Sequence, residues 1–131
     1  MKILIVEDDL ASRKFLFRFL SQYGECDLTV DGMEGLDAFK LATKDGEPYD
    51  LVCLDIMMPK LDGIKTLKVI RNIEKKEGIE EAKMCKVIIT TALNDAATVL
   101  ETYDNDCEAF AVKPINTEKF LEVLKKIGLV E

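Results

Sequence analysis

The residues best suited to chemistry in this sequence are carboxylates and a lysine that directly follow apolar runs. Asp55 comes straight after Leu51-Val52-Cys53-Leu54, four consecutive apolar residues that are typical of a strand buried on both faces. An ionised carboxylate at the end of such a strand is costly unless something solvates or pairs it. Asp55 alone would most simply end its strand, but similar points of the chain carry Glu7-Asp8, Thr91 and Lys113.

These groups need a framework that brings distant segments to one edge. Apolar runs and helical spacing predict five strands, each followed by a helix. The predicted strands cover residues 2–6, 25–30, 51–54, 86–90 and 108–112, and the predicted helices cover 10–23, 31–43, 64–76, 94–103 and a last segment after Asn116. This alternation predicts one α/β domain over residues 1–131, with a parallel sheet covered by helices on both faces. In such folds, ligands bind at the carboxyl ends of the strands, where the reactive groups fall.

The three carboxylates Glu7, Asp8 and Asp55 predict a cation site at that edge. Like charges raise one another's pKa unless a cation neutralises them. Oxygen ligands without nitrogen or sulfur suit a hard, partly hydrated ion, and Mg²⁺ fits best. Thr91 and Lys113 offer a hydroxyl and a positive charge to a phosphoryl group. Asp55 would then attack phosphorus in line and form an acyl phosphate.

Composition excludes several other classes of function. The chain has no histidine, which removes Ser-His-Asp and Cys-His catalysis and histidine metal sites. A formal net charge of −7 argues against direct nucleic-acid binding, because phosphate contacts need a basic surface. No apolar run approaches the roughly 18 residues that span a bilayer, and no signal peptide is visible. We therefore expect a cytoplasmic protein without membrane insertion. The four cysteines are far apart and form no C-x-x-C pair, which argues against zinc ligation and favours reduced thiols in the core.

Along its whole length the chain resembles the receiver domain of two-component response regulators. The matching motifs are Ile5-Val6-Glu7-Asp8, Asp55-x-x-Met58-Pro59-x-x-Asp62-Gly63, Thr91-Ala92 and Phe110-Ala111-Val112-Lys113-Pro114. The resemblance implies a single-domain, flavodoxin-like (βα)5 doubly wound sheet with strand order 2-1-3-4-5. It also implies a phospho-acceptor switch, with Mg²⁺-dependent self-phosphorylation and self-dephosphorylation but no other enzyme activity.

The same resemblance assigns metal and acceptor roles by position. Asp55 is the expected phospho-acceptor. Asp8 is the expected direct ligand of Mg²⁺, and Glu7 is the acid expected to act on the metal through water. Met57 is expected to lend its backbone carbonyl to the metal.

For the switch, the resemblance points to residues of the last two strands. Thr91 and Lys113 are expected to hold the phosphoryl oxygens, and Phe110 corresponds to the aromatic switch residue that follows the movement of Thr91. The Lys113–Pro114 peptide bond is expected to be cis. Asp106 departs from the family pattern, which usually has glycine seven residues before the lysine.

The implied partners are a sensor histidine kinase or phosphotransfer protein as donor, and a downstream protein. The downstream protein is expected to bind the surface formed by the fourth helix, the last strand and the last helix. Since no effector domain follows Glu131, output by protein binding is the main expectation. Onward transfer of the phosphoryl group in a phosphorelay is the alternative.

Other classes fit the sequence less well. A phosphatase of the haloacid dehalogenase type would need a second Asp two residues after Asp55, where Met57 stands. A flavin or nucleotide binder would need a Gly- or Ser/Thr-rich phosphate loop after the first strand, where Glu7-Asp8-Asp9 would repel phosphate. A degenerate receiver used as a scaffold would lack acceptor-site groups that are all present here.

Overall fold

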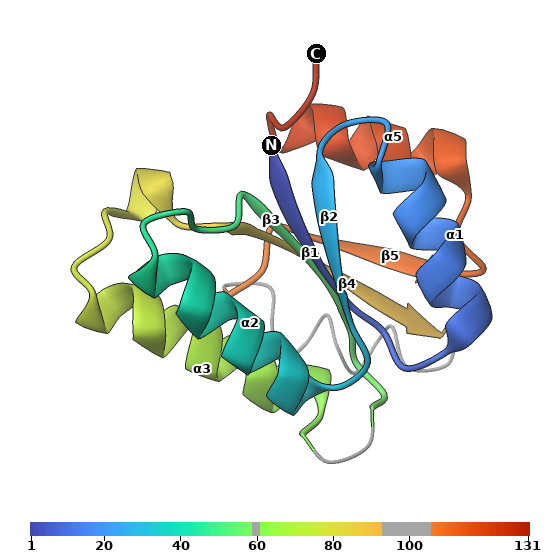
Figure 1. Ribbon diagram of the computed structural model, residues 1–131. Coiled ribbons are helices and arrows are strands. Elements are labelled where there is room, and N and C mark those ends of the chain that lie inside the picture. Colours follow the sequence, from blue (N-terminus) through green and yellow to red (C-terminus); the bar gives the residue numbers. More distant parts are fainter. Residues whose placement is uncertain (59–60, 93–105) are drawn as a thin grey trace.

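The structure is a computed structural model of the 131-residue chain, and it describes residues 1–58, 61–92 and 106–131. Five parallel strands form one sheet in the order β2-β1-β3-β4-β5, with helices on both faces (Figure 1). The strands are β1 (Lys2–Val6), β2 (Glu25–Thr29), β3 (Leu51–Asp55), β4 (Lys86–Ala92) and β5 (Ala109–Lys113). The helices are α1 (Leu10–Leu20), α2 (Gly32–Lys44), α3 (Gly63–Lys76) and α5 (Thr117–Lys126). The predicted fold and strand order are confirmed, and the predicted helix over 94–103 lies outside the described residues.

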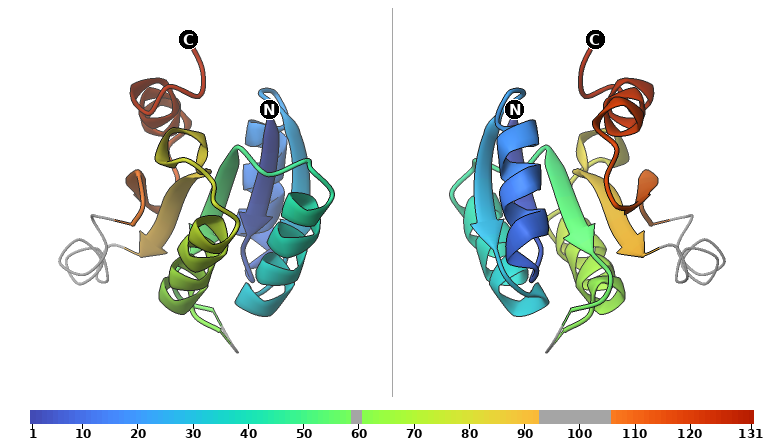
Figure 2. Two further views of the ribbon diagram at one scale, coloured as in Figure 1. Left: turned by 90° about the vertical axis from the view of Figure 1, so that its left-hand side faces the viewer. Right: turned by 90° about the vertical axis from the view of Figure 1, so that its right-hand side faces the viewer.

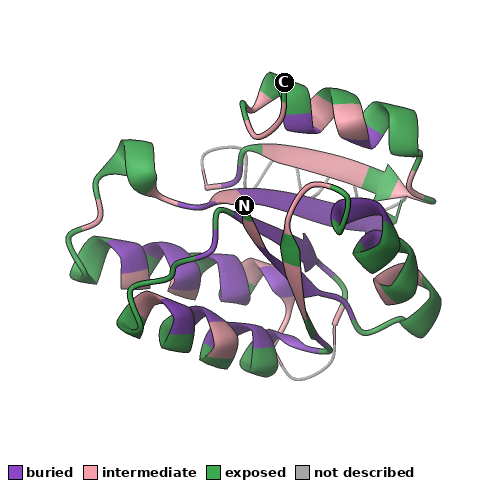
Figure 3. Cartoon of the chain, turned by 45° about the horizontal axis from the view of Figure 1, so that its top comes forward, coloured by how far each residue is buried: buried purple, intermediate pink, exposed green. Residues whose placement is uncertain are grey.

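The helices divide between the two faces of the sheet. Figure 2 shows the sheet from its two faces: α2 and α3 lie in front of it in the left view, and α1 and α5 lie in front of it in the right view. Buried residues are concentrated in the central strands and on the inner faces of the helices (Figure 3). Every residue of β3 is buried, as the run of apolar residues predicts. The central strand thus delivers Asp55 to the carboxyl edge of a rigid core.

Polar caps hold the start of each described α-helix close to that edge. The side chains of Asp9, Asp31, Asp62 and Asn116 each accept a hydrogen bond from the backbone N–H three residues on. Each such cap typically contributes about 1 kcal/mol. Because the caps lie in the loops after the strands, they also fix the backbone of the edge where the candidate site lies.

Some element boundaries differ from the prediction. The first helix ends at Leu20 rather than at residue 23, because the chain must turn there to pair β2 with β1. The N–H groups of Tyr23 and Gly24 both donate to the Leu20 carbonyl, and Glu25 N–H donates to Met1 at 2.9 Å. A side chain at Gly24 would overlap the Met1 carbonyl, so glycine is needed for this close approach. The last strand begins at residue 109 rather than 108.

Asp106, the departure from the family pattern, is held through its backbone. The Asp106 carbonyl accepts a hydrogen bond of 2.8 Å from Nε of Arg71 in α3. Arg71 is itself buried, with Nη1 2.6 Å from Glu74 and Nη2 3.1 Å from Glu108. Glu108 also accepts the backbone N–H of Val87 at 2.6 Å. This network ties α3 to β4 and to the segment that enters β5. None of the described helices is long and apolar enough to cross a membrane.

Candidate functional site

The three predicted carboxylates meet at the carboxyl edge of the sheet. One carboxylate oxygen from each of Glu7, Asp8 and Asp55 lies within 4.8 Å of the others. Val6 and Leu54 are register partners in β1 and β3, so the residues that follow them, Glu7 and Asp55, are neighbours. Glu7 and Asp55 are buried and Asp8 is exposed. The cluster therefore has two buried carboxylates and one that faces solvent, an arrangement that suits a partly hydrated cation.

Lys113, the last residue of β5, joins the same cluster. Its Nζ lies 2.6 Å from Oε1 of Glu7 and 3.3 Å from Oδ1 of Asp55. Burial alone would lower the pKa of Lys113, but the hydrogen bond to Glu7 and the charge of Asp55 outweigh it and raise the pKa. The ammonium group therefore stays charged. It lies beside Asp55, the carboxylate that the sequence predicts to accept a phosphoryl group.

Asp55 is partly protonated near neutral pH when no cation is bound. Burial, and after it the negative charge of Glu7, raise the pKa of Asp55 to about 7, although the charge of Lys113 opposes the shift. A protonated carboxyl is a poor nucleophile, so a cation at this cluster would favour the reactive, ionised form. Metal binding and ionisation of Asp55 are thus coupled.

The loop after β3 folds back onto Asp55. Gly63 N–H donates to the Ile56 carbonyl at 3.1 Å, and a Cβ at Gly63 would overlap the backbone carbonyl of Asp55. Asp62 caps α3 immediately before it, with Oδ1 2.9 Å from the Lys65 nitrogen. The Asp62-Gly63 pair therefore allows α3 to start directly against the backbone of Asp55.

Arg13 of α1 holds the backbone of the acid pair, a contact that the sequence pattern did not predict. Its Nη1 donates to the carbonyl of Glu7 at 2.9 Å and to that of Asp8 at 3.3 Å. Asp9 N–H also donates to Oε2 of Glu7 at 3.2 Å. On the amphipathic pattern Arg13 falls on the polar face of its helix, and only the path of the loop turns it inward. No local signal would have found this role.

Thr91 and Phe110 lie on one face of neighbouring strands. Thr91 pairs with Val112 and Ile89 pairs with Phe110, so the side chains of Thr91 and Phe110 are diagonal neighbours. Thr91 is buried and its hydroxyl donates to the Ala92 carbonyl at 3.3 Å, while Phe110 is half-buried. The structure places Thr91 at the edge that carries Asp55, but its hydroxyl is bonded elsewhere.

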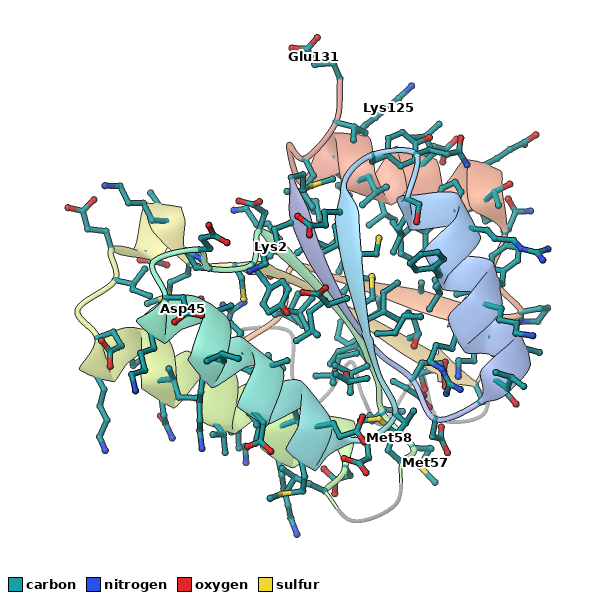
Figure 4. All side chains as sticks on the ribbon, in the orientation of Figure 1. Lys2, Asp45, Met57, Met58, Lys125 and Glu131 are labelled. Carbon is teal, nitrogen blue, oxygen red and sulfur yellow. The ribbon has the colours of Figure 1, made fainter. Side chains whose placement is uncertain are left out.

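Met57 and the proline peptide complete the predicted positions. Met57, two residues beyond Asp55, is 65% exposed, and Met58 packs partly against the core. In Figure 4 both lie near the bottom of the view, well away from Lys2, where β1 begins. The Lys113–Pro114 peptide bond is cis, as expected.

Comparison with known proteins identifies the family. The sequence profile of the response regulator receiver domain matches residues 3–125. The chemotaxis protein CheY of Treponema pallidum is 31% identical over 128 residues, which are 96% of this chain and 81% of that protein. The osmosensing histidine protein kinase SLN1 of Saccharomyces cerevisiae is 30% identical over 126 residues. That match covers 95% of this chain but only 10% of the kinase, so the chain spans a small part of this relative.

Solved structures share the fold. A response regulator receiver domain protein from Clostridium thermocellum aligns with a TM-score of 0.75 at 23% identity, covering 95% of this chain and 91% of that one. Vibrio cholerae chemotaxis protein CheY4 aligns with a TM-score of 0.76 at 24% identity, covering 96% and 97%. The chain belongs to the response regulator receiver domain family of two-component signalling. Members act as phospho-acceptor switches rather than conventional enzymes, and Mg²⁺ and an aspartyl phosphate are standard for the family.

Proposed function

We propose that this chain is a stand-alone receiver that accepts a phosphoryl group from a sensor histidine kinase on Asp55. Phosphorylation would then change its affinity for a downstream protein. The observation that carries the proposal is the position of Lys113 Nζ, which contacts both Glu7 and Asp55 at the base of a three-carboxylate cluster. The 81% coverage of Treponema pallidum CheY supports the stand-alone form. We expect the protein to work in the cytoplasm, since no disulfide joins its four cysteines, all of which the structure describes.

The residues present fit a magnesium ion. Asp8 and Asp55 would bind it through carboxylate oxygens, Glu7 would act through water, and Met57 would lend its backbone carbonyl. The donor set consists of oxygen atoms only, as a hard cation requires. When bound, the ion supplies positive charge that offsets the carboxylates and the incoming phosphoryl oxygens.

In the proposed reaction an ionised Asp55 oxygen attacks the phosphorus of the donor. The new O–P bond forms as the bond from phosphorus to the donor's leaving atom breaks, and the electron pair of that bond leaves with the donor. Lys113 would turn from Asp55 to a phosphoryl oxygen while Glu7 keeps it charged and in place. Orientation and charge supply the catalysis, so no general base is needed.

Thr91 and Phe110 would couple the negative charge of the phosphoryl group to a change in the shape of the protein surface. A phosphoryl group on Asp55 offers an acceptor that is stronger than the Ala92 carbonyl, so the Thr91 hydroxyl would move to donate to it. Phe110, the half-buried diagonal neighbour, would rotate inward into the space that Thr91 leaves. Because Phe has no hydroxyl to satisfy, its burial is favourable.

The proposed output surface includes a groove of about 700 Å³ between β5 and α5. Phe110 and Val112 line it from β5, and Lys119 and Val123 line it from α5. Rotation of Phe110 would therefore reshape the groove itself. The fourth helix, which the sequence also assigns to this surface, lies outside the described residues.

The test is phosphorylation with a small donor. Wild-type protein incubated with acetyl phosphate and Mg²⁺ should gain the mass of one labile phosphoryl group. Asp55→Asn should lose the gain, and Asp37→Asn, at an exposed position of α2, should keep it. An unchanged gain in Asp55→Asn would refute the assignment. Rapid return of the group to a histidine phosphotransfer protein, with no change in target affinity, would favour the phosphorelay alternative.

A further inference from the structure

Positive charge is concentrated on α2 and α3, although the whole chain carries −7. These helices contain seven positive and three negative side chains, a balance of +4, so the remaining residues carry −11. One negative side chain, Glu74, is buried against Arg71 and is absent from the surface. The outer surface of α3 is left with lysines and no acid. They are Lys65, Lys68, Lys75 and Lys76, all exposed.

A groove of about 600 Å³ lies between the two helices at the end where both finish. Lys40 lines it from α2, and Val69, Asn72, Ile73, Lys75 and Lys76 line it from α3. Val69 and Ile73 are half-buried and form an apolar strip between the lysines. The groove therefore combines positive side chains with an apolar floor.

Helix electrostatics explain only part of this arrangement. Lysines in a last turn are stabilised by the helix dipole, which accounts for Lys75 and Lys76. Lys65 and Lys68 lie in the first half of α3, where the dipole disfavours positive charge. Within the described parts of the chain, no ion pair engages Lys40, Lys75 or Lys76. These charges are available to a partner.

We propose that the groove between α2 and α3 binds an acidic amphipathic helix of a partner protein. Carboxylates along such a helix would pair with Lys40, Lys75 and Lys76, while its apolar side would cover Val69 and Ile73. A nucleic-acid backbone would pair with the lysines but leave the apolar strip uncovered, and the net charge of the chain would repel a long polyanion. The surface shares no lining residue with the groove between β5 and α5, and α5 lies on the opposite face of the sheet from α2 and α3 (Figure 2). The proposal does not depend on phosphorylation of Asp55.

The test uses synthetic peptides as probes. A fluorescein-labelled helical peptide with a leucine stripe and glutamates beside it should bind with a Kd on the order of 10–100 μM at low salt, and more weakly at high salt. A scrambled peptide of the same composition and a peptide with lysine for glutamate should not bind. The double variant Lys75→Glu/Lys76→Glu should lose at least about tenfold in affinity, and Lys75→Gln/Lys76→Gln should lose less.

A matched control separates the groove from net charge. Lys14→Glu/Lys125→Glu changes the net charge equally but uses exposed positions of α1 and α5, so its affinity should stay within about twofold. Amide chemical shifts should move at residues 40 and 69–76. Equal loss in the control variant, equal binding of the scrambled peptide, tighter binding of an oligonucleotide, or shifts centred on β5 and α5 would each overturn the proposal. Phosphorylation of Lys75→Glu/Lys76→Glu by acetyl phosphate, measured in parallel, tests the proposed function separately.

Discussion

Lys113 lies closer to Glu7 than to Asp55, at 2.6 Å against 3.3 Å. Its shorter contact is therefore with Glu7. In the proposed reaction Glu7 keeps the ammonium group in place, and the longer contact with Asp55 is the one that a phosphoryl oxygen would replace. The same geometry explains why the pKa of Asp55 stays high, because the lysine only partly offsets burial and the charge of Glu7.

Removing the lysine charge should impair both reactivity and stability. Lys113→Met leaves Glu7 and Asp55 buried without a cation, so the rate of phosphorylation by acetyl phosphate should fall at least about tenfold. The free energy of unfolding should fall by about 1–2 kcal/mol at pH 8, less than for a fully buried pair, because the Lys113 side chain is 24% exposed. Urea titration and a phosphorylation time course measure the two effects. Lys125→Met, at an exposed position, should change neither.

Stability without metal should depend on the ionisation of Asp55. The pKa of Asp55 in the folded protein is about 7, above the usual value near 4. The protonated side chain therefore contributes to the free energy of unfolding in full below about pH 4, and this contribution is lost as the pH rises through 7. Asp55→Asn should therefore be more stable than wild type at pH 8. The difference in the free energy of unfolding should be only about 1–2 kcal/mol, because the site is open to water on one side. The difference should vanish near pH 4.

Mg²⁺ should reduce that difference in stability. Binding to the folded state stabilises by mass action, so millimolar Mg²⁺ should raise the unfolding midpoint of wild type at pH 8 more than that of Asp55→Asn. Urea titrations at pH 4 and pH 8, with and without Mg²⁺, provide the measurement. A wild type as stable as Asp55→Asn at pH 8 without Mg²⁺ would contradict the raised pKa.

Arg13 should control the affinity of the site for Mg²⁺ through the backbone of Glu7 and Asp8. In Arg13→Met the two carbonyls lose their donor, and the dissociation constant for Mg²⁺ should rise about three- to tenfold by calorimetry. Arg13→Lys should recover part of the affinity, and Arg18→Met, exposed on the same helix, should keep all of it. Equal or tighter Mg²⁺ binding in Arg13→Met would show that the charge of Arg13 matters more than its hydrogen bonds.

The acyl phosphate should be long-lived. Hydrolysis needs a water molecule in line with the O–P bond, and the side chains two residues beyond Asp55 and Thr91 are Met57 and Leu93, which cannot orient water. Met57 is largely exposed beside the acceptor, and Leu93 lies outside the described residues. Met57→Asn with Leu93→Glu should shorten the lifetime, measured as phosphate release. An unchanged or longer lifetime would count against this account.

The gain in partner affinity should run through Thr91. Beryllofluoride, as a phosphoryl mimic, should raise the affinity of wild type for its target about five- to hundredfold, a range typical of coupled sites. Thr91→Ala lacks the hydroxyl that moves, so it should gain little, since a ligand shifts an equilibrium only by its differential contacts with the two states. Binding measured with and without beryllofluoride gives the comparison. A full gain in Thr91→Ala would exclude this coupling.

Local patterns in the sequence were sufficient to predict the alternation of strands and helices and the edge of the sheet at which the polar groups lie. Apolar runs such as residues 51–54 define buried strands, and caps such as Asp31 and Asn116 define helix starts, because both depend on neighbours in the chain. Since parallel strands share one carboxyl edge, a residue that follows a strand is placed without knowledge of its contacts. Glu7, Asp8, Asp55 and Lys113 were found in this way.

The contacts among these groups, and the pKa values that follow from those contacts, could not be predicted from the sequence. Three interactions join segments that are far from each other along the chain or that no local pattern predicts. They are the ion pair of Lys113 with Glu7, the hydrogen bond from Arg13 to the Glu7 carbonyl, and the hydrogen bond from Arg71 to the Asp106 carbonyl. The pairing of β2 with β1 sets the end of α1 at Leu20, and local helix propensity does not predict this boundary. Local patterns fix secondary structure, whereas distances between distant side chains and their pKa values follow from packing and burial, which exist only in the folded chain.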